Sequence, residues 1–379
     1  MNSVPSSGSQ SISRRHFARV AAAGLTAAAA APAMAQQTSE TVRWRLTSSF
    51  PKNLDTLFGA AQTIARVTGE LTDGKFVIQL FAAGEIVPGL QVLDAVSNAT
   101  VECGQTYTGY YIGKEPAMIF DGSLPFGLTP RQHNAWLLFG DGRKLMDEVY
   151  DSFGVVGLPC GQTGGQMFGW FRKELKTTAD FQGLKMRTAG FGGRVMAKLG
   201  VVPQQIAGGD IYPALEKGTI DAAEWVGPYD DEKLGLYKVA KYYYYPGWWE
   251  GGPELDLFVN TKAWSELPKD YQAILEAACA EANIDCMAKY DALNPPALRR
   301  LVAAGVQLRP FPREIMQACH KAAVEVYDEF ATTNPKFKKV YEPWKKFRDE
   351  DILWFRVAEQ NFDTFMATAS AQSAAPAKK

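Results

Sequence analysis

The chain has 379 residues, of which 46% are hydrophobic and 21% charged, enough apolar material for one large or two medium-sized globular cores. This composition excludes a disordered or collagen-like protein. Lys and Arg number 40 against 41 Asp and Glu. Removal of the first 35 residues, which carry three arginines and no acidic residue, leaves 37 against 41 and a net charge of −4. A mildly acidic chain lacks the basic surface of a nucleic-acid-binding protein, so no nucleic-acid partner is expected.

Residues 1–35 have the pattern of an export signal. Arg14 and Arg15 precede a run of small, weakly apolar residues, and Ala33-Met34-Ala35 has the small-x-small form of a signal-peptidase site. This order predicts a twin-arginine signal peptide and a periplasmic protein. No later stretch approaches the roughly 18 to 20 uninterrupted apolar residues that a membrane span needs.

The chain after this signal opens with the pattern of a β-α-β unit. Val42, Trp44 and Leu46 alternate with polar residues, which is typical of a strand with one buried face, and residues 76–80 repeat the pattern. Residues 55–71, between them, carry helical spacing. Further elements are predicted as helices at 88–98, 191–199 and 209–217 and as strands at 101–105, 154–158, 167–171, 184–187 and 222–226. This alternation predicts an α/β protein with mostly parallel, helix-covered sheets.

Long helical patterns dominate the last third of the chain. Residues 268–293 and 313–330 are predicted helices, and Pro295-Pro296 is expected to break or kink the first of them. The stretch from Phe337 to Met366 carries so many large apolar side chains that it needs a deep groove or a partner chain to cover it.

Histidine and cysteine chemistry is poorly supported. Only His133 and His320 remain after cleavage, and neither lies near a candidate nucleophile, so acyl transfer and zinc catalysis are not expected. An odd number of cysteines leaves at least one thiol free, and buried free thiols are the favoured interpretation. The five cysteines are Cys103, Cys160, Cys279, Cys286 and Cys319.

Several polar residues are predicted at strand ends, where open α/β sheets bind ligands. Arg187 offers a planar two-donor fork for a carboxylate, although a surface salt bridge would also explain it from that segment alone. Glu224 and Trp225 end another strand, and Glu250 follows in an aromatic-rich loop. Two carboxylates near an arginine predict a site for an anionic ligand and a hard cation, and oxygen ligands favour Na⁺ or Ca²⁺ over zinc. Gln166 is a candidate amide ligand.

Aromatic residues near these positions have two interpretations. Residues 242–245 are four tyrosines, followed by Trp248-Trp249, and such a cluster belongs either to a sheet core or to a pocket wall. Tyr107 and Tyr110 follow a predicted strand, and either hydroxyl is a candidate contact for a ligand oxygen.

Three motifs resemble a known family. Gly84-Glu85-Ile86-Val87-Pro88, Leu184-Lys185-Met186-Arg187 and the segment from Ile211 to Glu224 resemble the DctP-type solute receptors of tripartite ATP-independent periplasmic (TRAP) transporters. The resemblance covers nearly all of the mature chain. Glu224-Trp225, Trp249-Glu250 and the aromatic C-terminal helix are similar to the branch that binds 2-oxo acids such as pyruvate, or lactate, together with a metal ion.

The resemblance implies roles for individual residues. Arg187 pairs with the ligand carboxylate, and Gln166 faces both ligand and metal. Glu224, the main-chain carbonyl of Trp225 and Glu250 fall where the branch places the ligands of Na⁺ or Ca²⁺. Relatives can carry Gln at the position of Glu250, and the added negative charge either favours Ca²⁺ or is neutralised by a neighbour.

The apolar wall of the site is also inferred. Tyr107, Trp225 and Glu250 are expected to contact the ligand, and Phe191 with Trp248-Trp249 is expected to complete a wall that limits the length of its acyl chain.

The implied fold is a two-lobed α/β periplasmic binding protein, or clamshell, with extended C-terminal helices. Residues 40–160, completed by 254–310, are expected to form the first lobe and residues 161–253 the second, with a hinge or tight turn at Gly161–Gly165. Residues 311–366 are expected to form a dimerising helical region, followed by a disordered tail at 367–379.

The implied function is that of a periplasmic receptor that binds a small 2-oxo monocarboxylate with a metal cation and delivers it to the TRAP membrane permease. It is expected to be a homodimer without catalytic residues. A receptor for lactate or another organic acid without metal is one alternative. An exported enzyme is another, although the sequence has no cofactor motif or nucleophile-base pair.

Overall fold

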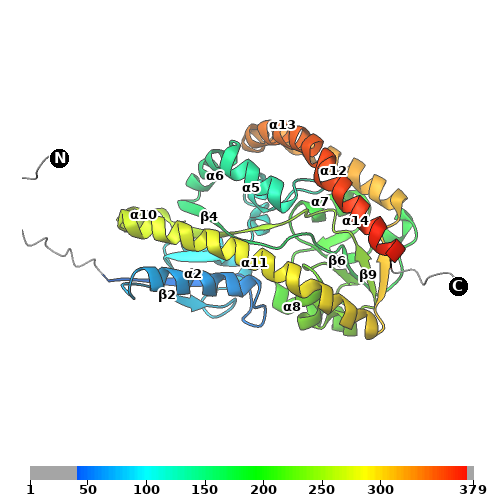
Figure 1. The fold of residues 1–379 in the computed structure, drawn as a ribbon, viewed down its shortest axis with the longest axis horizontal. Helices are drawn as coiled ribbons and strands as arrows, with labels where there is room; N and C mark the ends of the chain where they lie inside the picture. The colour runs from blue at the N-terminus through cyan, green and yellow to red at the C-terminus, as the bar shows by residue number, and fades with distance from the viewer. Residues whose placement is uncertain (1–40, 374–379) are drawn as a thin grey trace, which may run out of the picture. The chain divides into compact units, whose positions relative to one another are not determined.

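The computed structural model describes residues 41–373, so the predicted signal peptide and residues 374–379 lie outside the described part of the chain. The described residues form two mixed β-sheets covered by helices (Figure 1), as the predicted α/β class requires. The first sheet has five strands in the order β2-β1-β3-β10-β4. These strands are, in that order, Phe76–Phe81, Val42–Ser48, Cys103–Thr106, Glu254–Asn260 and Val155–Gln162.

The predicted β-α-β opening is confirmed. β1 pairs in parallel with β2, with Val42 opposite Phe76, and α2 (Leu57–Leu71) connects the two strands. The turn into β2 needs a residue with positive φ, which Gly74 supplies at +74° while its N–H donates to the carbonyl of Gly69 at 2.8 Å. Local pattern and turn chemistry therefore fix this unit together.

One strand of the first sheet runs against its neighbours. β10 lies between β3 and β4 and is antiparallel to both, so that Phe258 pairs with Gly104 on one side and Gly157 on the other. The expectation of a mostly parallel sheet holds for β1, β2 and β3 but misses this strand. The chain leaves the first sheet through β4 and returns to it through β10, so these two strands connect the sheets.

The second sheet has six strands in the order β11-β9-β5-β8-β6-β7. These strands are, in that order, Gln307–Pro310, Tyr242–Tyr245, Gly169–Phe171, Ala222–Ala223, Lys185–Arg187 and Val202–Gln204. β5 is antiparallel to β8 and β9, whereas β6 runs parallel to β7 and β8. The predicted strand at 154–158 is β4 and belongs to the first sheet.

Helices fill the connections between strands. The shorter α-helices are α3 (Val92–Ser97), α4 (Ile119–Gly122), α5 (Pro130–Phe139), α6 (Gly142–Asp151), α7 (Gly190–Lys198), α8 (Gly208–Lys217), α9 (Pro228–Leu234) and α10 (Thr261–Glu266). Single 3₁₀ turns lie at Gly89–Gln91, Thr108–Tyr111, Pro116–Met118, Thr178–Phe181 and Leu236–Lys238. Between residues 41 and 373, no helix is long and apolar enough to cross a membrane. The five cysteines are buried free thiols, as predicted.

α11 (Lys269–Ala303) is the longest helix and packs against α2, β4 and α9 (Figure 1). Pro295-Pro296 was predicted to break or kink this helix, and a break is wrong because the helix continues for seven residues beyond Pro296. The two prolines remove the N–H partners of the Asp291 and Ala292 carbonyls. Both of these residues are exposed, so water can hydrogen-bond to the freed carbonyls.

Three helices end the described chain: α12 (Arg313–Thr333), α13 (Pro335–Val357) and α14 (Glu359–Ser373). The first half of α13 buries one face, formed by Phe337, Val340, Tyr341 and Trp344, of which Trp344 is 1% exposed. The second half of α13 and the whole of α14 expose large apolar side chains. These are Ile352, Leu353, Trp354, Val357, Phe362, Phe365 and Met366. The stretch from Phe337 to Met366 was expected to need a deep groove or a partner chain to cover it. Within the chain, only the first part of this stretch is covered.

Candidate functional site

The six residues predicted to contact the ligand or the cation line one small pocket. Tyr107, Gln166, Arg187, Glu224, Trp225 and Glu250 surround it, and the free space inside is about 30 Å³. A single water molecule needs roughly 10 to 15 Å³ by the same kind of measure, so the pocket admits a few atoms at most without movement of its walls. The other lining residues are Phe50, Leu57, Tyr110, Thr163, Ala189, Val226, Pro253 and Leu255.

The polar half of the pocket comes from the second sheet and its loops. Arg187 is the last residue of β6, and Glu224 and Trp225 directly follow β8, which pairs in parallel with β6. Parallel strands end on the same edge of a sheet, so their terminal side chains meet there. Gln166 precedes β5, and Glu250 lies in the loop between β9 and β10.

Arg187 and Glu224 form a buried ion pair, with exposed fractions of 2% and 3%. Arg187 Nη1 donates to Glu224 Oε1 at 2.5 Å and to the Glu224 carbonyl at 2.9 Å, and its Nε donates to the carbonyl of Ile206 at 3.0 Å. Glu224 Oε1 also accepts from the N–H of Ala189 at 3.0 Å. Among the described residues, Arg187 Nη2 and Glu224 Oε2 have no partner, so both remain available to a ligand.

Glu250 is the second buried carboxyl of the site. Its Oε1 accepts a hydrogen bond from the Tyr107 hydroxyl at 2.5 Å. Burial and the negative charge of Glu224 raise the pKa of Glu250 to about 8, against the Tyr107 hydrogen bond and the charge of Arg187, which lower it. Burial likewise raises the pKa of Glu224, whereas Arg187 and the Ala189 N–H oppose this shift. The two carboxyls therefore resist being ionised together unless further positive charge is present.

Three oxygen atoms converge beside these carboxyls. The side-chain oxygen of Gln166 lies 3.1 Å from the Trp225 carbonyl oxygen and 3.2 Å from Glu250 Oε2, and its amide nitrogen donates to Thr163 Oγ1 at 3.2 Å. Three acceptors then face one another without a donor. Rotation of the amide by about 180° turns Gln166 into a donor to both oxygens, and a cation among the three oxygens satisfies them in the unrotated state.

The donor set fits a hard cation. Oxygens that share one Na⁺ or Ca²⁺ at about 2.4 Å lie roughly 3 to 3.5 Å apart, which matches the spacing of this cluster. Across residues 41–373, no three His, Cys, Asp or Glu side chains are grouped to hold a metal. A cation here would instead depend on an amide oxygen and a main-chain carbonyl beside the carboxylates, which are typical of Na⁺ and Ca²⁺ and unlike zinc.

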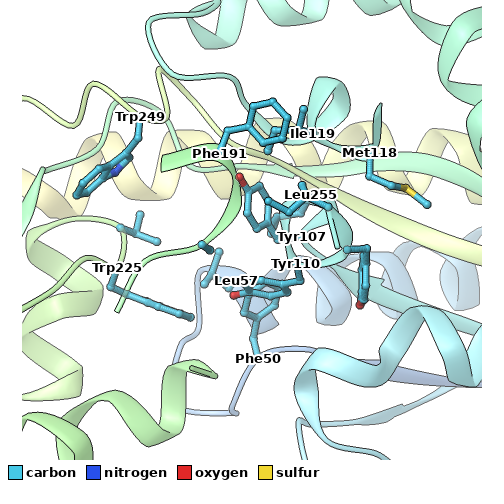
Figure 2. Close-up of a cluster of buried hydrophobic side chains, with 14 of the residues drawn as sticks. Phe50, Leu57, Tyr107, Tyr110, Met118, Ile119, Phe191, Trp225, Trp249 and Leu255 are labelled. Atoms are coloured by element: carbon cyan, nitrogen blue, oxygen red, sulfur yellow. The ribbon is translucent and has the colours of Figure 1, made fainter. Parts of the chain in front are cut away.

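The apolar half of the pocket comes mainly from the first sheet and its connections. Phe50 follows β1, Leu57 opens α2 and Leu255 lies on β10, and Figure 2 shows all three with Tyr107 and Tyr110. Trp225 faces them from the second sheet, with its ring centroid 6.5 Å from that of Phe50. The sequence analysis missed Phe50, Leu57 and Leu255, although the rule of ligand binding at strand ends also applies to the end of β1.

The inferred wall of Phe191, Trp248 and Trp249 is wrong, since none of them lines the pocket. Phe191 packs in the core against aromatic residues of α12 and α13. Trp248 stacks on Phe126 and Trp249 on Phe168. These three large side chains therefore pack in the hydrophobic core, whereas Tyr107 and Trp225 line the pocket as predicted.

Two α/β sheets linked by the connections after β4 and before β10, with a small arginine-containing pocket at their strand ends, form an architecture typical of periplasmic solute receptors. The model of the family "bacterial extracellular solute-binding protein, family 7", or DctP, matches residues 47–334. The chain belongs to this family.

Similar proteins have known ligands. A monocarboxylate 2-oxoacid-binding periplasmic protein of Nostoc sp. is 54% identical over 328 residues, which span 86% of this chain and 90% of that protein. A TRAP transporter solute-binding protein of Bordetella bronchiseptica, a mixed-occupancy dimer with calcium and picolinate in its occupied site, is 54% identical with a TM-score of 0.87 over 88% of this chain and 99% of that one. A TRAP solute-binding protein of Pseudoalteromonas atlantica with bound sodium and pyruvate is 37% identical, with a TM-score of 0.83 over 85% and 98%.

Proposed function

We propose that this chain is the periplasmic solute receptor of a TRAP transporter and that it binds a small 2-oxo monocarboxylate together with Na⁺ or Ca²⁺. The observation that carries this proposal is the convergence of the unpaired Nη2 of Arg187, the carboxyls of Glu224 and Glu250, the Gln166 amide and the Trp225 carbonyl in one pocket. The relatives from Bordetella, Pseudoalteromonas and Nostoc support the ligand class.

In this proposal Arg187 binds the ligand carboxylate through Nη2. Gln166, the carbonyl of Trp225 and Glu250 would hold the cation through the oxygens that converge in the pocket, and Glu224 would add its free Oε2. The cation would neutralise the carboxyls and attract the ligand's 2-oxo and carboxylate oxygens. Tyr107 keeps Glu250 in position by its hydrogen bond. Tyr107, Gln166, Trp225 and Glu250 are also the proposed ligand contacts beside Arg187.

The lobes are proposed to follow the two sheets. Residues 40–160 and 254–310 were expected to form the first lobe and 161–253 the second. Because β11 (Gln307–Pro310) pairs with β9 of the second sheet, we place residues 307–310 in the second lobe instead. Closure of the two lobes would bury the ligand, the cation and the carboxyls together, which lowers the cost of desolvating each charge.

The exposed apolar side chains of α13 and α14 support a homodimer, and the Bordetella relative is a dimer. Trp354, 61% exposed, is the test position. Trp354→Asp should convert the dimer to a monomer in sedimentation velocity. Leu71→Asp, at a comparably exposed position on α2, is the matched control and should stay dimeric. A Trp354→Asp dimer as tight as that of the control would contradict this interface.

Export by the twin-arginine pathway and delivery of the ligand to the TRAP permease complete the proposal. A receptor role without turnover is supported by the family. A metal-independent receptor for lactate or another organic acid is the alternative that the experiment below separates, and an exported enzyme is the alternative that an assay of ligand turnover would separate.

The experiment is a thermal-shift screen of refolded, ligand-stripped protein with pyruvate, 2-oxobutanoate, 4-methyl-2-oxopentanoate, lactate and C4-dicarboxylates. Each acid is tested with Na⁺, Ca²⁺ or a chelator, since binding raises Tm by mass action. A shift with 2-oxo monocarboxylates that disappears with the chelator and without Na⁺ is the expected result. A shift with dicarboxylates alone, indifferent to cations, would remove Gln166, Glu224, Trp225 and Glu250 as cation ligands.

A further inference from the structure

The loop between β1 and α2 contacts α9 and α11 through charged groups. The carboxylate of Asp55 forms ion pairs with Lys233 and, at 2.9 Å, with Lys289, which also donates to the Asp55 carbonyl at 2.6 Å. Burial opposes ionisation of Asp55, but hydrogen bonds from both lysines outweigh it and lower the pKa of Asp55 to about 2. The ion pairs are therefore formed throughout the neutral and mildly acidic range.

Thr56 makes a second contact with α9. Its hydroxyl donates to Asp230 Oδ1 at 2.7 Å, and Tyr290 of α11 donates to Asp230 Oδ2 at 2.6 Å. Thr56 is 1% exposed and Asp230 is fully buried, so water does not replace either bond.

α9 belongs structurally with the second sheet. Asp231, next to Asp230, accepts from Trp170 Nε1 of β5 at 2.8 Å and from the Tyr243 hydroxyl of β9 at 2.6 Å. The Asp55 and Thr56 contacts therefore join the first sheet's opening loop to an element fixed on the second sheet.

The next residue, Leu57, lines the ligand pocket and is 1% exposed. Leu57 is the first residue of α2, so its backbone is held in a helical turn directly after the two contacting residues. Arg187, Glu224 and Gln166 line the pocket from the second sheet, and Leu57, Leu255 and Phe50 line it from the first, so in the proposed binding mode the acyl chain of a ligand held by Arg187 extends toward these three apolar side chains. With about 30 Å³ free, a longer ligand must displace these side chains.

We propose that Asp55, Thr56 and Leu57 act together as a size-dependent latch. Leu57 limits the length of the ligand. The Asp55 and Thr56 contacts with α9 form fully only when the ligand is short enough for the Leu57 side chain to keep its position in the pocket wall. This inference rests on the proposed function. Three consecutive residues at a helix start move as a unit, so displacement of Leu57 by an oversized acyl chain pulls Thr56 from Asp230 and Asp55 from Lys233. The protein then selects ligands by size in two ways: through the direct contact of Leu57 with the ligand, and through the formation of the Asp55 and Thr56 contacts with α9.

The latch predicts different effects on ligand affinity for substitutions of Leu57, Thr56 and Asp55. Leu57→Ala enlarges the pocket, so the ratio of the dissociation constants for pyruvate and 2-oxopentanoate should shift by at least about tenfold toward the longer acid, the range found for one or two methylenes in an apolar pocket. Thr56→Val removes one buried hydrogen bond of the latched state, so it should weaken pyruvate by about tenfold and 2-oxopentanoate much less, because the longer acid already prevents this contact. Asp55→Asn should act like Thr56→Val, but less strongly because the ion pair is partly exposed.

The measurements are calorimetric titrations with both acids at saturating Na⁺ or Ca²⁺, and Tm of the ligand-free proteins. Leu93→Ala, a fully buried leucine away from the pocket, controls for lost core volume and should leave the ratio unchanged. Glu85→Gln controls for Asp55→Asn, because Glu85 pairs with Lys52 of the same loop without reaching α9. The Thr56 and Asp55 variants should keep the ligand-free Tm if the contacts belong to the latched state.

Two outcomes would overturn the latch: an unchanged ratio in Leu57→Ala, or a Thr56→Val variant that loses ligand-free Tm but not affinity. The second result would make Thr56 a purely structural residue. Failure of the proposed function is separable, since in that case the unmodified protein binds neither acid.

Discussion

Substitution of Arg187 tests the centre of the site because this residue has two roles that can be measured apart. Arg187→Ala removes the proposed ligand contact and also leaves Glu224 buried, with the Ala189 N–H at 3.0 Å as its remaining partner among the described residues. Breaking a buried ion pair from one side costs about 3 to 5 kcal/mol. A typical domain has about 5 to 15 kcal/mol to lose, so the variant should fold but be clearly destabilised.

Glu224→Gln provides the matched second change. A glutamine oxygen still accepts from Ala189, so the double variant Arg187→Ala, Glu224→Gln buries no charge and should recover at least about 2 kcal/mol of the loss. Urea unfolding in chelator, followed by tryptophan fluorescence, gives these free energies. Titration with pyruvate should show no binding by either Arg187 variant, since loss of a charge-assisted contact costs about 2 to 5 kcal/mol.

Two results would refute this reasoning. Additive effects of the two substitutions on unfolding would mean that Arg187 and Glu224 are not coupled in the folded state. Near-native affinity for pyruvate in Arg187→Ala would remove Arg187 from the ligand site, whatever its effect on stability.

Two further predictions concern buried carboxyls. Burial raises the pKa of Asp231 from 3.8 to about 7, against hydrogen bonds from Tyr243 and Trp170 that lower it. The folded state thus holds a proton that the unfolded chain releases, so this group's stabilising contribution is complete below pH 4 and disappears as pH rises through 7, about 4 kcal/mol in all. Asp231→Asn should remove that much of the pH dependence of the urea-unfolding free energy between pH 4 and 8, and curves parallel to the unmodified protein would contradict the assignment. Glu250→Gln should weaken Ca²⁺ binding at least about tenfold relative to Na⁺ in calorimetry, because it removes one anionic ligand; an unchanged Ca²⁺ to Na⁺ ratio would exclude Glu250 from the cation site.

The features of the fold that depend on local sequence patterns could be predicted from the sequence. The β-α-β opening follows from period-two and helical spacing, and Arg187 and Glu224 could be placed together because both end strands that prove to be parallel neighbours. Their common pocket follows from this topology.

Long-range pairing was harder to predict. β10 alternates acidic and apolar residues like a half-exposed strand, yet Glu254 and Asp256 are fully buried and burial raises both of their pKa values well above normal. Nothing in a single sequence distinguishes such a strand from a surface strand, since its burial depends on β3, β4 and α11 packing around it. The role of Leu57 was missed for a related reason. The helical spacing shows that Leu57 lies on the apolar face of its helix, but it does not show whether the side chain packs in the core or lines a ligand pocket.

Charge balance inside the pocket bears on the charge of the cation that the proposed site would hold. Ionised Glu224, ionised Glu250 and a ligand carboxylate bring three negative charges against the single positive charge of Arg187. Ca²⁺ would cancel the remaining two charges when Glu250 is ionised, and Na⁺ would cancel the one that remains when Glu250 is protonated, a state that burial and the charge of Glu224 favour by raising the pKa of this carboxyl. In either case the closed pocket is neutral, which buried charges in so small a volume require. A carboxylate ligand without any cation would leave net negative charge in the pocket unless both Glu224 and Glu250 were protonated, so the residues that line it favour the cation site proposed above.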